Sequence, residues 1–216
     1  MKKIAILVAM GMEAEKLLAR MENPVGKKFV RGSIGQAEVV LYRCGWGMRN
    51  AARGMHALVD HCKPDLILNY GVSGGMQPDI RLGETVVALS SFPCSGKAFK
   101  VGIAQPTDQA LAELAAQALP GARLAPICTS QGLIVNKKRK ARIVAKSGTV
   151  CCDMETYAAA MAANELGVPL LVIRCISDTL EPTSLLAFQK NGSLAAEKAA
   201  AAVERVIHAM VERNNP

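Results

Sequence analysis

The most informative segment of the sequence for the fold is Leu170-Leu171-Val172-Ile173-Arg174-Cys175-Ile176-Ser177-Asp178. Its first four residues are all apolar, and only Arg174 interrupts the apolar run before Ser177. A continuous apolar run is typical of a strand that is buried on both faces, as in a sheet covered by helices. We therefore predict an α/β fold in which an acidic residue, Asp178, directly follows a central strand.

Similar strand segments alternate along the chain with segments of helical periodicity. Helices between buried strands indicate a mixed, mostly parallel sheet with right-handed crossovers. Two short strands that meet at Gly35-Gln36 predict a hairpin. No linker rich in glycine, serine or proline divides the chain, so we expect residues 1–216 to form one domain. The predicted strands are 4–9, 29–34, 38–44, 66–70, 84–90, 125–130, 150–152 and 170–176, and the predicted helices are 12–21, 49–62, 107–119, 136–145, 155–166 and 194–214.

Length and composition exclude several classes of protein. The 216 residues are 50% apolar and 20% charged, which suffices for a buried core and excludes a collagen, a long coiled coil or a disordered chain. The seven cysteines are scattered without a C-x-x-C spacing, so we expect neither disulfides nor a zinc site, and a cytoplasmic location. No apolar run reaches the roughly 18 residues of a membrane span. Lys2-Lys3 and the apolar residues after them imitate a signal peptide, but Glu13 and the helical pattern behind it favour a buried first strand.

The net charge of +8 leaves two interpretations open. Clustered lysine and arginine bind nucleic acid, and a basic protein also suits a small anionic substrate such as phosphate. The densest basic run is Lys137-Lys138-Arg139-Lys140, and no aromatic residue is interleaved with it. We therefore expect a solvated helix face there. A nucleic-acid-binding module remains an alternative, which salt-sensitive affinity for DNA or RNA would reveal.

Three glycine-rich segments follow predicted strands. They are Gly45-Trp46-Gly47, Gly71-Val72-Ser73-Gly74-Gly75 and Ser130-Gln131-Gly132, and we expect each to be a turn. None is a P-loop, and none has the G-x-G-x-x-G pattern of dinucleotide-binding proteins, which argues against nucleoside triphosphates and nicotinamide cofactors. Ligands of open α/β sheets bind beyond the carboxyl ends of the strands, where glycine lets the backbone approach closely. The three segments therefore predict a ligand site at that edge.

Acidic residues stand at three of the same strand ends. Glu13 comes after the first strand, Asp153 and Glu155 follow 150–152, and Asp178 ends 170–176. A carboxylate beside so much apolar sequence costs free energy unless it is paired or has a function. Each of them alone is also explained as an acid that caps the first turn of a helix. Together they favour a site built from carboxylates.

The segments Ala9-Met10-Gly11-Met12-Glu13, Gly71-Val72-Ser73-Gly74-Gly75-Met76, Asp153-Met154-Glu155 and Arg174-Cys175-Ile176-Ser177-Asp178 resemble the ordered motifs of the nucleoside phosphorylase superfamily. The resemblance extends from residue 1 to about residue 180. The most similar branches are the methylthioadenosine/S-adenosylhomocysteine nucleosidases and the hopanoid-associated phosphorylases. The resemblance implies a partly closed mixed sheet with surrounding helices, a homo-oligomer, and cleavage of the N-glycosidic bond of a purine nucleoside without a metal or an organic cofactor.

The resemblance also assigns roles to residues. Asp178 matches the acid that protonates purine N7, Glu155 the glutamate that binds the ribose hydroxyls, and Glu13 the glutamate that activates water in the nucleosidases. A carboxylate near the sugar offsets the positive charge of an oxocarbenium-like transition state. The expected substrate-binding residues are Met154 beneath the sugar, the segment Gly71, Val72, Ser73 and Gly74, the base-reading Leu133 and Ile134, and Ser177 next to the acid.

Three departures from the family pattern bear on the acceptor. Val72 replaces a serine, Asn69 stands where the hexameric phosphorylases have a phosphate-binding arginine, and Leu133 falls near the position of an aromatic residue. Losing phosphate ligands favours water, and we expect hydrolysis of a 5′-modified adenine nucleoside. Gly47 and Arg49 open a predicted helix and form a candidate anion site, so phosphorolysis with phosphate as co-substrate stays an alternative. A non-catalytic nucleoside- or nucleic-acid-binding module is the second alternative.

Overall fold

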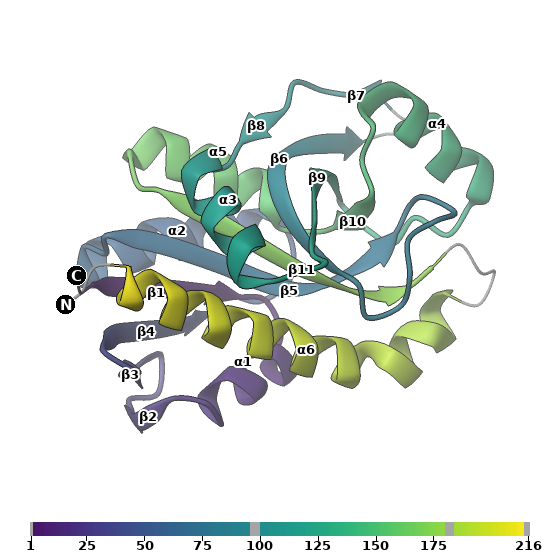
Figure 1. Cartoon of the computed structure of the whole chain (residues 1–216). Helices are drawn as coiled ribbons and strands as arrows, with labels where there is room; N and C mark the ends of the chain where they lie inside the picture. The colour runs from purple at the N-terminus through teal and green to yellow at the C-terminus, as the bar shows by residue number, and fades with distance from the viewer. Residues whose placement is uncertain (1, 96–99, 180–183, 214–216) are drawn as a thin grey trace.

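A computed structural model describes residues 2–95, 100–179 and 184–213. In these parts of the chain, strands and helices alternate as the apolar periodicity predicts (Figure 1). The strands are β1 (Lys3–Val8), β2 (Glu22–Val25), β3 (Phe29–Ile34), β4 (Ala37–Arg43), β5 (Leu66–Gly75), β6 (Thr85–Ser95), β7 (Lys100–Val101), β8 (Gln105–Pro106), β9 (Arg123–Ser130), β10 (Cys151–Asp153) and β11 (Leu170–Asp178). The helices are α1 (Gly11–Leu18), α2 (Met48–Cys62), α3 (Gln109–Ala118), α4 (Lys137–Ser147), α5 (Thr156–Leu166) and α6 (Ser184–Glu212).

All the strands belong to one mixed sheet with the order β10-β9-β6-β11-β5-β1-β4-β3-β2, and β7 and β8 pair with β6. The pairs β4–β1, β1–β5, β5–β11, β6–β9 and β9–β10 are parallel, and β3–β4 forms the predicted hairpin. An additional antiparallel pairing joins β10 to β5, so that β5, β11, β6, β9 and β10 form a ring. The mixed α/β fold and its partial closure are therefore confirmed.

Two helical layers bury the two faces of the sheet. Alternate residues of β1 show this directly: Ile4 and Ile6 pack into a core with α1, α3 and α6, whereas Ala5 and Leu7 pack into a second core with α2 and α5. In Figure 1, α6 crosses the near face of the sheet beside α1, and α2 lies behind. Side chains of a strand alternate between the faces of a sheet, so a strand with apolar residues at every position needs cover on both sides.

Strand β5 differs from the prediction. Gly71-Val72-Ser73-Gly74-Gly75 continues the strand and does not form a turn. The reason is pairing on both edges, because Gly71 and Val72 pair with β11 and Gly75 pairs with Cys151 of β10. Of the other two glycine segments, Gly45-Trp46-Gly47 lies in a loop and Gln131-Gly132 follows Ser130, the last residue of β9.

Helix α6 also begins ten residues earlier than predicted, at Ser184. The added part of the helix contains Gly192. An interior glycine costs a helix about 1 kcal/mol, which tertiary packing overcomes. A Cβ at Gly192 would meet Met12 of α1 and Phe188 at ordinary contact distance, so this part of the helix is packed against its neighbours. The short strands β2, β7 and β8 were missed; β2 contains Pro24, which is tolerated at a sheet edge.

Two expectations from the sequence concern the cysteines and the membrane spans. All seven cysteines are described, and all are free thiols. Within residues 2–95, 100–179 and 184–213, no helix combines the length and the apolarity that crossing a membrane requires.

Candidate active site

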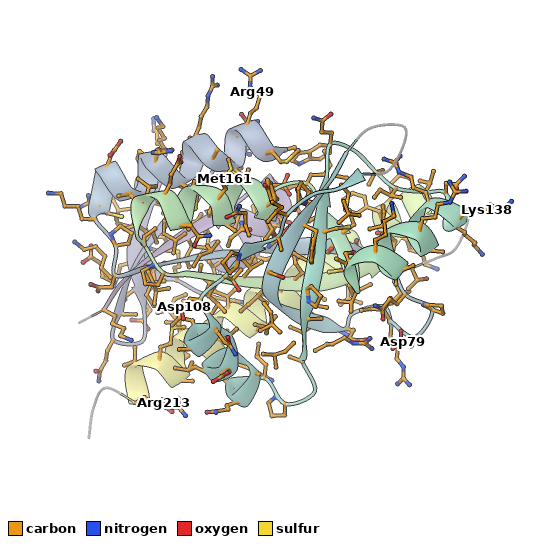
Figure 2. All side chains as sticks on the ribbon, turned by 90° about the horizontal axis from the view of Figure 1, so that it is seen from above. Arg49, Asp79, Asp108, Lys138, Met161 and Arg213 are labelled. Atoms are coloured by element: carbon orange, nitrogen blue, oxygen red, sulfur yellow. The ribbon has the colours of Figure 1, made fainter. Side chains whose placement is uncertain are left out.

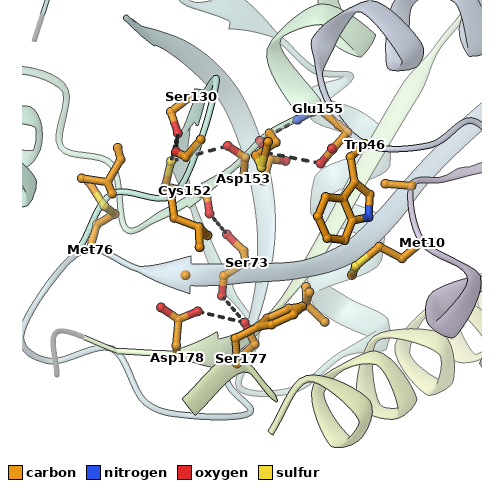
Figure 3. Close-up of a pocket in the computed structure, with 18 of the residues that line it drawn as sticks. Met10, Trp46, Ser73, Met76, Ser130, Cys152, Asp153, Glu155, Ser177 and Asp178 are labelled. Carbon is orange, nitrogen blue, oxygen red and sulfur yellow. Dashed lines mark hydrogen bonds between the residues drawn. The ribbon is translucent and has the colours of Figure 1, made fainter. Parts of the chain in front are cut away.

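An apolar cavity of about 190 Å³ lies where β5, β10 and β11 end (Figure 3). It brings Glu13, Glu155 and Asp178 together, although they are far apart in the sequence. Figure 3 shows Asp178 and Glu155 on opposite sides of this cavity. Of the other predicted site residues, the cavity is lined by Met154, Val72, Ser73, Gly74, Leu133, Ile134 and Ser177.

Glu13 lies in the first turn of α1 and is only 3% exposed. Its Oε2 accepts a hydrogen bond from the Met10 N–H at 2.9 Å, and its Oε1 accepts one from the Val72 N–H at 3.0 Å. Burial raises the pKa of Glu13 above its usual value, and these two N–H donors oppose the shift. The carboxylate therefore caps its own helix and also faces the cavity.

Gly71 does not line the cavity but lies directly behind Glu13. A Cβ at position 71 would come within 2.3 Å of Glu13 Oε1, which no real contact allows. The residue is a glycine because the carboxylate from α1 packs against its Cα, and not because a turn requires it.

Glu155 lies between β10 and α5. Its Oε1 accepts the Gly47 N–H at 2.7 Å, and its Oε2 accepts the Met154 N–H at 3.3 Å. Burial is the main reason why the pKa of Glu155 rises to about 7, the negative charge of Asp153 adds to it, and the Gly47 N–H opposes it. Near neutral pH, this group changes its charge with small changes in its surroundings.

The structure does not support the predicted anion site at Gly47 and Arg49. The Gly47 N–H already binds Glu155, and Arg49 is exposed at the start of α2, where its side chain points away from the body of the protein (Figure 2). These residues line a separate, polar depression beside Trp46. The positive N-terminal end of α2 therefore binds and orients the Glu155 carboxylate, in place of a free anion.

Asp178 ends β11 and shares a cross-strand row with Gly74 and Cys152. Gly74 of β5 pairs with Asp178 on one side and with Cys152 of β10 on the other. A Cβ at Gly74 would lie 3.1 Å from Asp178 Oδ2. The Ser177 hydroxyl donates to Asp178 Oδ1 at 3.0 Å. Burial raises the pKa of Asp178, whereas the Ser177 hydrogen bond and the positive charge of Lys140 oppose the shift.

A buried ion pair supports the site from behind. Arg174 Nε donates to Asp153 Oδ2 at 2.8 Å, and its Nη2 donates to Thr156 Oγ1 at 2.7 Å and to Asn69. Asp153 in turn accepts from the Thr129 hydroxyl at 2.6 Å. A buried charge pair is stable only when its remaining hydrogen-bonding positions are filled, and this network fills them. It fixes the start of α5, and with it Glu155.

Several lining residues were not predicted. Lys140 was expected on a solvated face, but it is 3% exposed and lines the cavity. Lys140 lies three residues before the buried Ile143, on the same face of α4, and this spacing could have indicated that Lys140 is buried. Trp46, which is 62% exposed, and Met10 lie close together at the other end of the cavity (Figure 3). Trp46 is the single tryptophan of the chain and stands between two glycines, and this could have indicated that it lines the site.

Residues 3–208 match the phosphorylase superfamily, and the chain belongs to this superfamily. Within it, the chain is similar to the 5′-methylthioadenosine/S-adenosylhomocysteine nucleosidase of Geobacillus kaustophilus, with 30% identity over 98% of this chain and 99% of that protein. The enzyme of the same name from Geobacillus thermodenitrificans is also 30% identical, over 92% and 93% of the two chains. The family predicted from the sequence motifs is therefore confirmed.

Solved structures agree on the fold. A Streptococcus pneumoniae 5′-methylthioadenosine/S-adenosylhomocysteine nucleosidase with a transition-state inhibitor superimposes with a TM-score of 0.88 at 24% identity, over 96% of this chain and 99% of that one. A Helicobacter pylori futalosine hydrolase superimposes with a TM-score of 0.87 at 20% identity, over 96% and 97% of the two chains.

Proposed function

We propose that this protein is a nucleosidase that hydrolyses the N-glycosidic bond of a purine nucleoside, with adenine as the base and a modified 5′ position. One observation carries the proposal: Glu13, Glu155 and Asp178 line one apolar cavity at the ends of the sheet strands. The curated relatives that cover nearly all of the chain are nucleosidases for adenine nucleosides with sulfur at the 5′ position, by their names.

Asp178 is the proposed general acid. A purine leaves readily only when a ring nitrogen takes up a proton as the glycosidic bond breaks. Burial raises the pKa of Asp178, so it keeps a proton to a higher pH than an exposed aspartate does. The Ser177 hydroxyl fixes one carboxyl oxygen and leaves the other for N7 of the base.

Glu155 is proposed to bind the ribose hydroxyls. Its two oxygens already accept backbone N–H groups, which hold the carboxylate in one orientation at the cavity wall. Once ionised, it accepts hydrogen bonds from the sugar and stabilises the positive charge that develops at the anomeric carbon. Met154, the residue before it, lines the cavity and packs beneath the sugar.

Glu13 is proposed to orient and deprotonate the attacking water. Both of its oxygens are fixed by backbone donors, and each keeps a second lone pair for water. The N–H of Val72 donates a hydrogen bond to Glu13, although Val72 lacks the hydroxyl of the serine in the family pattern. Leu133 and Ile134 border the same cavity, where their backbone is proposed to contact the edge of the base.

Three observations favour water over phosphate as the acceptor. The Asn69 side chain is used within the protein, donating to the Leu7 carbonyl at 2.9 Å and accepting from Arg174. The Gly47 N–H is bound to Glu155, and Arg49 lies outside the cavity. Phosphorolysis remains the alternative activity, in which phosphate is a co-substrate. The hydrolytic reaction uses three carboxylates and water, so we propose no resident metal or organic cofactor.

The decisive experiment is incubation with 5′-methylthioadenosine, adenosine and inosine, with and without phosphate, followed by chromatography of the free base and the sugar. We expect adenine and a free sugar without added phosphate. Asp178→Asn should lower turnover at least about 100-fold, in the range of general acid catalysis, without loss of structure. Asp60→Asn on the exposed face of α2 is the matched control and should turn over like the wild type. A sugar phosphate that forms only with added phosphate would replace hydrolysis by phosphorolysis.

We also propose a cytoplasmic location and a homo-oligomeric state, as the sequence suggested. A small-molecule substrate is favoured over nucleic acid because carboxylates surround the cavity, whereas Lys137 and Lys138 lie exposed on α4. Binding of single- or double-stranded nucleic acid that weakens with salt, without turnover of any nucleoside, would support the binding module instead.

A further inference from the structure

Lys140 is an unusual lysine because it is buried at the cavity wall while its neighbours Lys137 and Lys138 are exposed. Its Nζ donates to the Gly75 carbonyl at 2.8 Å and to the Thr179 carbonyl at 3.3 Å. None of the ion pairs among the described residues includes it. An ammonium group is costly to bury, so a lysine in such a place requires an explanation beyond solubility.

Both carbonyls that Lys140 binds lie one residue beyond the pair that Gly74 and Asp178 form in the parallel strands β5 and β11. Thr179 follows Asp178 directly, and Gly75 follows Gly74, where a Cβ would lie 3.1 Å from Asp178 Oδ2. Lys140 therefore ties the end of β5 to the backbone just beyond β11, directly after Asp178.

The charge of Lys140 acts on Asp178 in particular. The titratable groups that face Lys140 are Asp178 on β11 and the thiols of Cys128 on β9 and Cys152 on β10. Among the described residues, Lys140 is the charged side chain whose field reaches Asp178, and its positive charge lowers the pKa of that carboxyl against the effect of burial.

We propose that Lys140 is a positioning residue for the general acid: it fixes the backbone directly after Asp178 to the end of β5, and it stabilises the carboxylate that remains after the proton has left. The inference rests on the proposed function. In that reaction the Asp178 proton goes to N7, the electrons of the C1′–N bond go to the purine, and water adds to C1′ while losing a proton to Glu13.

A positive charge is useful here because burial has two opposing effects on an acid. Burial holds the proton on Asp178, but it also makes the carboxylate left behind unstable, so burial alone produces an acid that donates poorly. A fixed positive charge nearby lowers the cost of that carboxylate in a site with little water. The balance of the two effects places the acid where it can both hold and release its proton.

The test compares Lys140→Met with Lys138→Met, which removes the same charge from the exposed face of the same helix (Figure 2). Two substrates are used over a range of pH: 5′-methylthioadenosine, whose base requires protonation, and a 4-nitrophenyl riboside, whose phenolate leaves without an acid. Lys140→Gln keeps two N–H donors for the carbonyls and removes the charge, so it measures the electrostatic part even if Lys140→Met folds poorly.

For Lys140→Met and Lys140→Gln we expect kcat on 5′-methylthioadenosine to fall about tenfold, part of the contribution of a general acid. The pH at which activity declines on the alkaline side should move upward, because Asp178 without the positive charge keeps its proton longer. Turnover of the 4-nitrophenyl riboside should stay within about twofold of the wild type, and Lys138→Met should resemble the wild type on both substrates.

Equal losses on both substrates, with an unchanged alkaline decline, would overturn the inference and leave Lys140 a structural residue. Unaltered kinetics of both Lys140 variants would overturn it as well. Wild-type protein without activity on any purine nucleoside would instead refute the proposed function, and the inference with it.

Discussion

Gly71→Ala tests whether the position of Glu13 matters for the reaction. Residue 71 is in strand β5, where alanine fits the backbone, so the cost of the substitution comes from contact alone. The new Cβ would lie 2.3 Å from Glu13 Oε1, whereas ordinary contacts begin at 3.4 Å, so the carboxylate must retreat by about 1 Å. That retreat breaks its hydrogen bonds with the Met10 and Val72 N–H groups. A hydrogen bond to a charged group contributes about 1.5–3 kcal/mol.

We therefore expect Gly71→Ala to lower the free energy of unfolding by about 3 kcal/mol, measured by urea denaturation monitored by circular dichroism. A misplacement of about 1 Å in a catalytic group costs about 100-fold in rate, and kcat/KM on 5′-methylthioadenosine should fall accordingly. Gly132→Ala is the control, because residue 132 lines the same cavity and a Cβ there meets nothing within 4 Å.

A double-mutant cycle makes the reasoning refutable. In a Glu13→Ala background the carboxylate is absent, so Gly71→Ala should cost nothing or stabilise the protein by about 0.5 kcal/mol through the unfolded chain. If Gly71→Ala is equally destabilising with and without Glu13, or if it leaves wild-type stability and activity, the assigned reason for this glycine is wrong.

Three further predictions concern other parts of the site. Arg174→Met should lower the free energy of unfolding in urea by about 3–5 kcal/mol because it leaves Asp153 buried without its partner, whereas Arg49→Met should change it by less than about 0.5 kcal/mol. On a 4-nitrophenyl riboside, kcat/KM should rise with pH around pH 7, where Glu155 with its pKa of about 7 ionises; a flat profile from about pH 5 to 8 would contradict its role. Trp46→Ala should leave the melting temperature unchanged, because the ring is exposed at the cavity. For substrates with a long apolar 5′ group it should raise KM more than it lowers kcat. Equal KM values for the variant and the wild type would exclude contact between Trp46 and that group.

Much of the fold and part of the site could be predicted from local sequence. The run of apolar residues from Leu170 onward had to be a doubly covered strand, and the carboxyl ends of parallel strands meet at one edge. Glu13, Glu155 and Asp178 could therefore be expected near one another without knowledge of the structure. The roles assigned to them come from the family resemblance and remain to be tested.

The features that were not predicted depend on partners far apart in the chain. Gly71 and Gly74 look like turn residues locally, but they are glycines in a strand because carboxylates from positions 13 and 178 pack against them. Lys140 looks solvated because its neighbours are charged, but it is buried and its ammonium group binds the carbonyls of Gly75 and Thr179. The Gly47 N–H looked free for an anion, but Glu155 occupies it from 108 residues away.

The paired residues across β10, β5 and β11 are held at a fixed spacing by the sheet. Cys152, Gly74 and Asp178 are neighbours in successive strands, and adjacent strands lie about 4.8 Å apart. The position of Asp178 relative to β10 is thus set by main-chain spacing, which side-chain substitutions barely alter. Evolution can consequently exchange an exposed cavity residue such as Trp46 to admit a different substrate, while the position of Asp178 relative to β10 stays constant.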